Sequence, residues 1–100
     1  MKELITSKQR AFLKGLANKI EPITQIGKDG ISEAFINQLN DALEARELVK
    51  VSIQKNSLLD TKETANKVAK LTNSEFVQAI GRKFVIYRKS KKKPKIDLPK

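Results

Sequence analysis

The sequence predicts an α/β fold: a single compact domain with the element order αβαβαββ and a four-stranded mixed sheet packed with helices. The first observation is length, because 100 residues suit one hydrophobic core. The second is periodicity, since apolar residues recur every 3.6 positions in some segments and alternate or form short runs in others. The third is connectivity: strand–helix–strand links normally form right-handed parallel crossovers, and two short strands joined at Gly81 favour an antiparallel hairpin.

The first half of the chain predicts helix, strand and helix. A capping box at Thr6 begins a helix over residues 7–18. The segment 19–22 ends this helix, because the residue before Pro22 disfavours the helical region, and a short strand is predicted over 23–26. A second amphipathic helix is predicted over 32–46. The first helix is expected to turn inward Phe12, Leu13 and Leu16, and the second to turn outward the carboxylates of Glu33, Asp41 and Glu44.

The second half predicts strand, helix and a hairpin. At Leu48 the apolar period changes to 2, which is typical of a half-exposed strand. Asp60 caps a helix over 61–71. Strands over 75–80 and 84–88 follow, and the second is apolar enough to lie in the middle of the sheet or under cover. We expect the helices to cover the sheet mainly on one face. The residues expected to point inward from the third helix are Ala65, Val68, Ala69 and, at its end, Leu71.

Charge divides the chain into a domain over residues 1–88 and a lysine-rich C-terminal tail over residues 89–100. The net charge is +10, and the tail holds six of the 21 basic residues and one of the 11 acidic residues. The tail and the domain are therefore both basic. A polyanionic partner is the expectation for such a chain, although a charged tail alone also serves solubility.

Catalysis and metal binding are disfavoured by the residues that are missing. The chain has no cysteine and no histidine, which removes thiolate nucleophiles, the usual general base and the commonest metal ligand. Its glycine loop lacks the spacing of a phosphate-binding Walker motif or of a dinucleotide loop. We expect no catalytic residues, no metal, no cofactor and no small-molecule substrate. No apolar run is long enough to span a membrane, so we expect a cytoplasmic protein without a membrane partner.

The loop Gly27-Lys28-Asp29-Gly30 is the first candidate site. Glycine lets the backbone adopt positive φ, and the helix that starts at Ser32 presents unpaired N–H groups with a partial positive charge. Such a loop can hold a phosphate. The alternative is an ordinary turn at Asp29-Gly30 with Lys28 solvated.

Two further basic pairs extend this candidate site. Arg10 and Lys14 are four apart on the first helix, and Arg82 and Lys83 lie in the hairpin turn. Each pair has a plainer reading: a solvated helix face for the first and protection of a sheet edge for the second. Gly15, inside the first helix, indicates close packing or a nearby ligand, because glycine there costs about 1 kcal/mol relative to alanine.

Five segments taken together resemble the CRM domain, the chloroplast RNA splicing and ribosome maturation family, and in particular its bacterial YhbY-type single-domain members. They are TSKQRAFLK (6–14), IGKDGIS (26–32), ALEARELVKV (42–51), VQAIGR (77–82) and VIYR (85–88). The resemblance spans about residues 4–98. It implies a fold similar to the C-terminal domain of translation initiation factor three, and a GxxG loop at Gly27, Lys28 and Gly30 that contacts RNA.

The expected function is therefore RNA binding. The resemblance implies ribosomal RNA in precursors of the large ribosomal subunit as the partner, and a role in ribosome assembly. The expected RNA-binding residues are Gly27, Lys28, Asp29, Gly30, Arg10, Lys14, Arg82 and Lys83. The alternative is a structural module that binds a protein partner, with its charge serving solubility.

Overall fold

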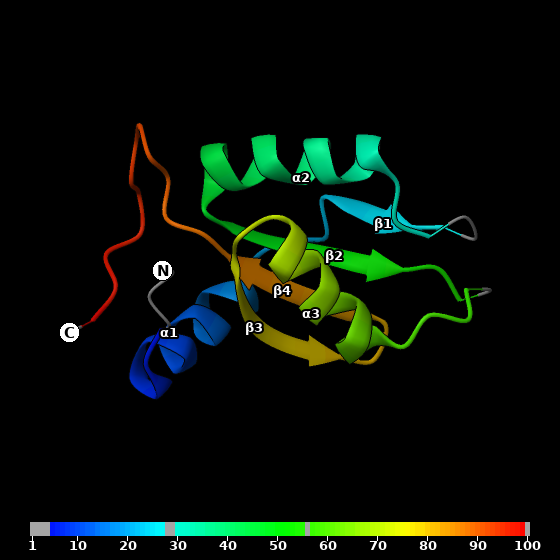
Figure 1. Ribbon diagram of the computed structural model, residues 1–100. Helices are drawn as coiled ribbons and strands as arrows, with labels where there is room; N and C mark the ends of the chain where they lie inside the picture. Colours follow the sequence, from blue (N-terminus) through cyan, green and yellow to red (C-terminus); the bar gives the residue numbers. More distant parts are fainter. Residues whose placement is uncertain (1–4, 28–29, 56, 100) are drawn as a thin grey trace.

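The computed structural model describes residues 5–27, 30–55 and 57–99, and has the predicted element order (Figure 1). The placement of Lys28 and Asp29 in the candidate loop lies outside the described residues. The helices and strands are α1 (Ser7–Ala17), β1 (Thr24–Ile26), α2 (Glu33–Arg46), β2 (Leu48–Ile53), α3 (Thr61–Leu71), β3 (Glu75–Ile80) and β4 (Lys83–Tyr87). None of the described helices is long and apolar enough to cross a membrane.

The sheet is mixed and has the strand order β1-β2-β4-β3. β1 runs parallel to β2, whereas β4 is antiparallel to both β2 and β3. The apolar strand β4 therefore occupies the interior of the sheet, which confirms the prediction made from its composition. Its partner β3 has an irregularity between Phe76 and Gln78, which changes the face to which the following side chains point.

The helices divide between the two faces of the sheet. α2 and α3 cover one face, where Leu39 and Val68 pack against Val51 and Phe84 in the larger core cluster. α1 lies on the opposite face, where Leu13 packs in a second cluster. Figure 1 shows α1 beneath one end of the sheet, apart from the other two helices. The expectation of a sheet covered mainly on one face is therefore met by α2 and α3, and α1 is the helix on the other face.

Three sequence signals fix the helix starts. The side chain of Thr6 accepts a hydrogen bond from the backbone N–H of Gln9, and the Gln9 side chain accepts one from the backbone of Thr6, which completes the predicted capping box. Ser32 and Asp60 cap α2 and α3 in the same way through their side-chain oxygens. Each cap satisfies an amide that would otherwise lack a partner in the first helical turn.

Two residues predicted to point inward are exposed instead. Phe12 is 41% exposed, because the stripe of α1 that meets the sheet is formed by Leu13 and Ala17, and Phe12 lies 100° around the helix from Leu13. Leu71 is 52% exposed at the end of α3. The remaining predicted core residues of α3, Ala65, Val68 and Ala69, are buried.

The C-terminal segment, residues 89–99, packs against the domain. Glu47, which is fully buried, accepts backbone hydrogen bonds from Ser90, Lys95 and Ile96 at 2.6–2.7 Å. Ile96 and Leu98 pack against the α1 core cluster. The segment 89–99 is therefore held along the end of the sheet, although the lysine side chains within it stay exposed. The boundary at residue 88 stays a prediction.

Glu44 also holds this segment, so it does not belong to a free acidic face of α2 as predicted. Its carboxylate accepts hydrogen bonds from the Ser90 hydroxyl and from the backbone amides of Lys91 and Lys92. These three bonds, with the Ser90 hydroxyl contributing most, lower the pKa of Glu44 from 4.5 to about 2.

Candidate nucleic-acid interface

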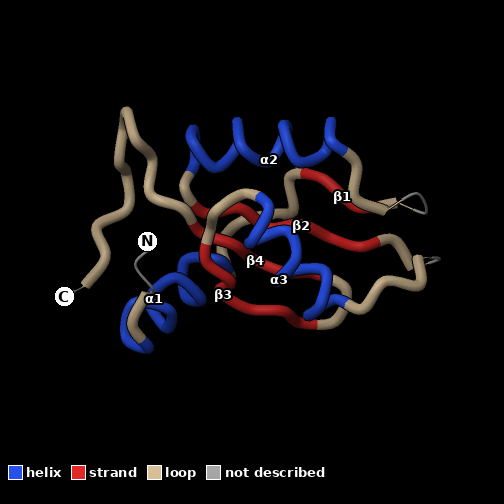
Figure 2. The backbone as a smooth tube through the Cα atoms, in the orientation of Figure 1, coloured by secondary structure: helices blue, strands red, loops and turns tan. Residues whose placement is uncertain are grey.

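Three connections meet at one end of the sheet, which we call the loop end. They are the segment after β1, the segment between β2 and α3, and the turn between β3 and β4; Figure 2 shows these loops side by side, across the sheet from the C-terminal segment. Hydrogen bonds join them: the Gln54 amide donates to the Ile26 carbonyl, and the Ile53 amide donates to the Arg82 carbonyl at 2.7 Å. The chain therefore brings two of the predicted basic sites, the glycine loop and the hairpin turn, to the same end.

The two glycines of the candidate loop differ in how strictly the backbone requires glycine. A Cβ on Gly27 would lie 3.2 Å from Gln54 Oε1, the end of a flexible side chain, which would have to shift by a few tenths of an ångström. Gly30 has a φ of +79°, in the left-handed region that favours glycine, and its amide donates to the Gly27 carbonyl. The described parts of the loop therefore make a tight turn that delivers the chain to the N-terminus of α2.

The N-terminus of α2 faces this turn. Ser32 Oγ accepts the Phe35 amide at 3.1 Å, and the amides of residues 33 and 34 precede it in the first turn, where helical amides have no intrahelical acceptor. This is the local geometry that favours an anion. The negative charge of Glu33 in the same turn disfavours anion binding, so the positive charge of neighbouring lysines has to exceed it.

Arg82 has a structural role that the sequence did not indicate. Its two terminal nitrogens donate to the carbonyls of Leu59, Gln54 and Ser57 at 2.7–3.1 Å. The guanidinium thus fixes the segment between β2 and α3 against the hairpin turn. Its assignment as an RNA contact stays a prediction, and the residue's removal would disturb the loop end itself.

Lys83 belongs to an uncovered half of the α1 face of the sheet. In β4, Lys83 alternates with Val85 and Tyr87, whose side chains pack toward α1, so Lys83 points to the same face. On β2 the same alternation places Lys50 and Ser52 on the face of Leu48, and Ser52 pairs with Lys83. α1 covers the Leu48 and Tyr87 end of this face and leaves the Lys83 end open.

We call this uncovered half the open sheet face. A shallow hollow of about 130 Å³ lies on it, lined by Lys50, Gln78, Ile80, Lys83 and Val85. Ile80 is 65% exposed there, and Lys83 is exposed as well. Sequence reasoning missed Lys50 and Gln78 as candidate contacts. The signal was the alternation of β2, which sets Lys50 and Ser52 against the buried Val49 and Val51, but only the position of α1 shows that this face is open.

Arg10 and Lys14 lie further along the same side of the sheet. Arg10 Nε donates to the carbonyl of Phe76 at 3.2 Å, which anchors α1 to the start of β3. The hairpin turn follows Ile80 at the other end of β3, about 13 Å away at ~3.3 Å per residue. Lys14 is exposed one turn after Arg10 on the same flank of α1. The structure therefore does not join Arg10 and Lys14 to the loop end directly; the open sheet face lies between them.

The opposite side of the sheet carries acidic groups. Asp41 is exposed on α2, which covers the other face, whereas Glu33 is exposed in the first turn of α2 beside the loop end. Within the described ranges there is no group of three or more acidic, cysteine or histidine side chains that could hold a metal ion.

A glycine turn beside a helix N-terminus, with lysines on an open sheet face, is suited to contact phosphates.

Comparison with known proteins gives matches over nearly the whole chain. A family model described as the CRS1 / YhbY (CRM) domain matches residues 5–88. The Bacillus subtilis protein named "probable RNA-binding protein YqeI" is 42% identical over 96 residues, which cover 96% of this chain and 100% of the relative. A Haemophilus influenzae protein named "RNA-binding protein" is 33% identical, with 96% of each chain covered.

A solved structure shares the fold. The solution structure of a hypothetical protein from Staphylococcus aureus superposes with a TM-score of 0.81 at 49% identity. The alignment covers 96% of this chain and 100% of that one.

Proposed function

This chain belongs to the CRS1 / YhbY (CRM) domain family, and from that premise we propose that it is an RNA-binding protein. Two relatives that align over nearly their whole length carry RNA binding in their names. The observation in this chain that supports the proposal most is the placement of its cations. Lys83 and Lys50 occupy an open sheet face that begins at the hairpin turn of the loop end, while exposed carboxylates of α2 lie on the other side.

The proposed contact begins at the loop end. A backbone phosphate approaches the turn between Gly27 and Gly30 and the first amides of α2, and Lys28, which is outside the described residues, supplies a charge to it. Lys83 and Lys50 neutralise the next phosphates along the open sheet face, and Lys14 extends the path onto α1. Asp29 is part of the loop and is assigned no charge contact.

The recognition we propose is of RNA shape more than of sequence. Phosphate contacts position a protein without reading bases. Base reading in single strands relies largely on stacking against aromatic rings. Of the five aromatic residues, Phe84 and Tyr87 are buried and Phe35 and Phe76 pack against the core, which leaves Phe12 as the exposed ring.

The finer proposal concerns the RNA. We propose that the protein binds ribosomal RNA in precursors of the large ribosomal subunit and acts there as a non-catalytic assembly factor in the cytoplasm. The resemblance of five sequence segments to YhbY-type proteins supports this role. A structured precursor RNA also fits a surface that has several phosphate contacts and little means of base stacking.

A pair of matched variants tests the RNA surface. Lys50→Gln with Lys83→Gln removes two positive charges from the open sheet face, and Lys62→Gln with Lys67→Gln removes two from the exposed side of α3. Fluorescence anisotropy with a structured ribosomal RNA fragment, measured over a range of salt concentrations, should show weaker binding for the first pair. The slope of log affinity against log salt should fall by about 1 to 2 for the first pair and change little for the second. Equal losses would mean that RNA binding depends on net charge alone.

A further inference from the structure

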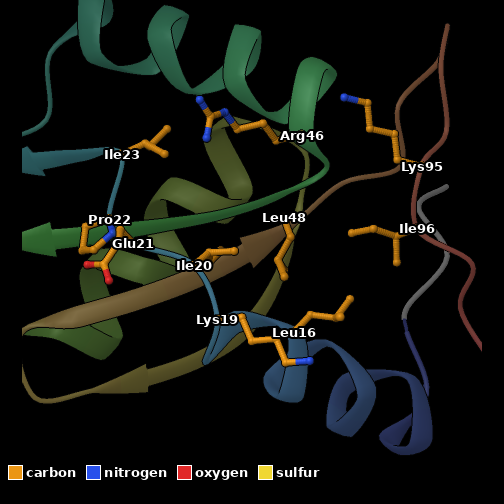
Figure 3. Close-up of a pocket in the computed structure, with 10 residues that line it drawn as sticks. All are labelled: Leu16, Lys19, Ile20, Glu21, Pro22, Ile23, Arg46, Leu48, Lys95 and Ile96. Atoms are coloured by element: carbon orange, nitrogen blue, oxygen red, sulfur yellow. The ribbon is translucent and has the colours of Figure 1, made fainter.

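A groove of about 780 Å³ lies at the end of the sheet away from the glycine loop (Figure 3). Its apolar walls come from the end of α1, the segment before β1, the start of β2 and the C-terminal segment. These walls are the side chains of Leu16, Ile20, Ile23, Leu48 and Ile96. The volume is in the range of pockets that bind ligands.

The groove lies where the first residues of β2 have no neighbouring strand on the β1 side. β1 pairs with β2 only from Thr24, opposite Val51, so among the described strands none lies beside Leu48 on that side. The Ile23 amide donates to the Lys50 carbonyl and the Gln54 amide donates to the Ile26 carbonyl, so alternate residues of β2 direct their backbone polar groups toward β1. By this alternation the N–H and C=O of Leu48 face the groove. An extended peptide could therefore make main-chain hydrogen bonds there.

The C-terminal segment, which forms one wall of the groove, is held in place by Glu47. Its Oε1 accepts the amides of Lys95 and Ile96 at 2.6 and 2.7 Å, which fixes Ile96 opposite Leu16 and Leu48. The Glu47 carboxylate is buried, so these bonds are shielded from water. The groove is thus formed before any ligand arrives, which lowers the ordering cost of binding.

The rim of the groove is cationic. Lys19, Arg46 and Lys95 line it, and among the described lining residues Glu21 carries the one carboxylate. All four residues are exposed, and within the described part of the chain none of the three cations forms an ion pair. In Figure 3 Arg46 and Lys95 lie on one side of the apolar floor and Lys19 on the other. An occupant that carries negative charge on both sides of an apolar strip would complement this rim.

We propose that this groove binds an extended acidic peptide segment with aliphatic side chains, supplied by a protein partner. The aliphatic side chains pack on Leu16, Ile20 and Leu48, and the carboxylates meet Lys19, Arg46 and Lys95. RNA fits less well, because the floor between the cations consists of aliphatic side chains, to which a sugar–phosphate backbone contributes no apolar contact.

The groove lies at the opposite end of β2 from the loop end. Leu48 begins β2 and Ile53 ends it beside the loop end, which places the groove about 17 Å from the glycine turn's end of the sheet at ~3.3 Å per residue. Lys50 of the open sheet face is two residues from Leu48, so the two surfaces approach each other along β2. The inference goes beyond RNA binding because the groove is assigned a protein segment as its ligand.

The test uses the full chain and a phage-displayed random peptide library. We expect selected peptides to be rich in Asp and Glu alternating with Leu, Ile or Val. Binding of a selected peptide, measured by fluorescence anisotropy, should weaken about tenfold in the variant Lys19→Glu with Arg46→Glu. The matched control, Lys62→Glu with Lys67→Glu on α3, carries the same charge change and should bind the peptide within about twofold of the original chain.

Chemical shifts locate the peptide without any substitution. In a ¹⁵N–¹H spectrum of the original chain, the peptide should shift the amides of Leu16, Ile20 and Ile96. Selection of peptides without acidic residues, or equal losses in the two variants, would overturn the proposal. So would an equal loss of affinity for a structured RNA and for the peptide in the rim variant, because the groove would then belong to the RNA surface.

Discussion

Replacing Glu47 with alanine should release the C-terminal segment and destabilise the domain. Glu47 links α2 to β2, has a φ of +67° and is fully buried. Its two carboxylate oxygens accept the amides of Ser90, Lys95 and Ile96 at 2.6–2.7 Å. The substitution removes all three acceptor contacts at once and leaves the donors without a partner.

The magnitude follows from these contacts. A hydrogen bond to a charged group contributes about 1.5–3 kcal/mol, and an amide left buried without a partner costs about 1–3 kcal/mol. The segment can lower this cost by moving into water, which instead loses the packing of Ile96 and Leu98 on the α1 core cluster. We therefore expect unfolding to become easier by about 2–4 kcal/mol, within the ~5–15 kcal/mol that holds a typical domain together.

Glu47→Gly is the matched comparison. Glycine also loses the carboxylate but accepts the positive φ without strain, which in other residues costs about 1–2 kcal/mol. The glycine variant should therefore be more stable than the alanine variant by about 1 kcal/mol. Urea unfolding followed by circular dichroism measures both, and hydrogen exchange reports on the amides of Lys95 and Ile96. An alanine variant within about 0.5 kcal/mol of the original chain, with these two amides still protected, would refute the reasoning.

Three further predictions concern single sites. Glu44 should make docking of the C-terminal segment depend on pH, because its pKa falls from 4.5 to about 2 on folding. Its contribution to docking is present above about pH 4.5 and is lost as the pH falls toward 2. Hydrogen exchange of the Lys91 and Lys92 amides measures this loss, and Glu44→Gln should remove the pH dependence. Gly15→Ala should raise stability by about 0.5–1 kcal/mol in urea unfolding, because no described atom lies within 4 Å of the added Cβ; a loss of stability would reveal a contact that the structure does not contain. Gly30→Val should weaken RNA binding, because a β-branched residue is strained at a φ of +79° and the turn should change shape, while circular dichroism should stay that of a folded domain, because no described atom lies within 4 Å of the added Cβ. Unchanged RNA affinity would leave the loop as an ordinary turn.

The order and type of the elements could be predicted because each carries its own local signal. The caps at Thr6, Ser32 and Asp60 set the helix starts within one residue. The apolar run of β4 predicted a central strand, and the structure confirms it. The face chosen by α1 could not be predicted, because an amphipathic helix fits either side of a sheet whose both faces offer apolar residues.

The candidate site was predictable in part. The glycine turn and the basic hairpin have sequence signals, and the fold places both at the loop end. Whether Lys50 is accessible to RNA depends on where α1 stops covering the sheet, which the sequence does not indicate. The structural role of Arg82 depends on three carbonyls that are more than 20 residues away in sequence. Close packing around Gly15 is ruled out among the described residues, so a ligand near α1 remains the prediction there.

The docking of the C-terminal segment could not be predicted from its charge. Its lysines predicted a polar arm, and their side chains are exposed. The docking depends on Glu44 and Glu47, whose bonds to the segment span 43–49 positions of sequence. Such long-range pairs leave no periodic pattern for a sequence to display. A truncation after residue 88 would therefore remove the three amides that bond to Glu47 as well as positive charge.

Sedimentation of a cell lysate through a sucrose gradient tests the proposed function most directly. With RNA intact, the protein should travel with precursors of the large ribosomal subunit, and ribonuclease should return it to the top of the gradient. The Lys50→Gln, Lys83→Gln variant should sediment less with the precursors than the Lys62→Gln, Lys67→Gln control. A protein that stays at the top of the gradient with RNA intact, or that sediments equally after ribonuclease treatment, would contradict the proposal.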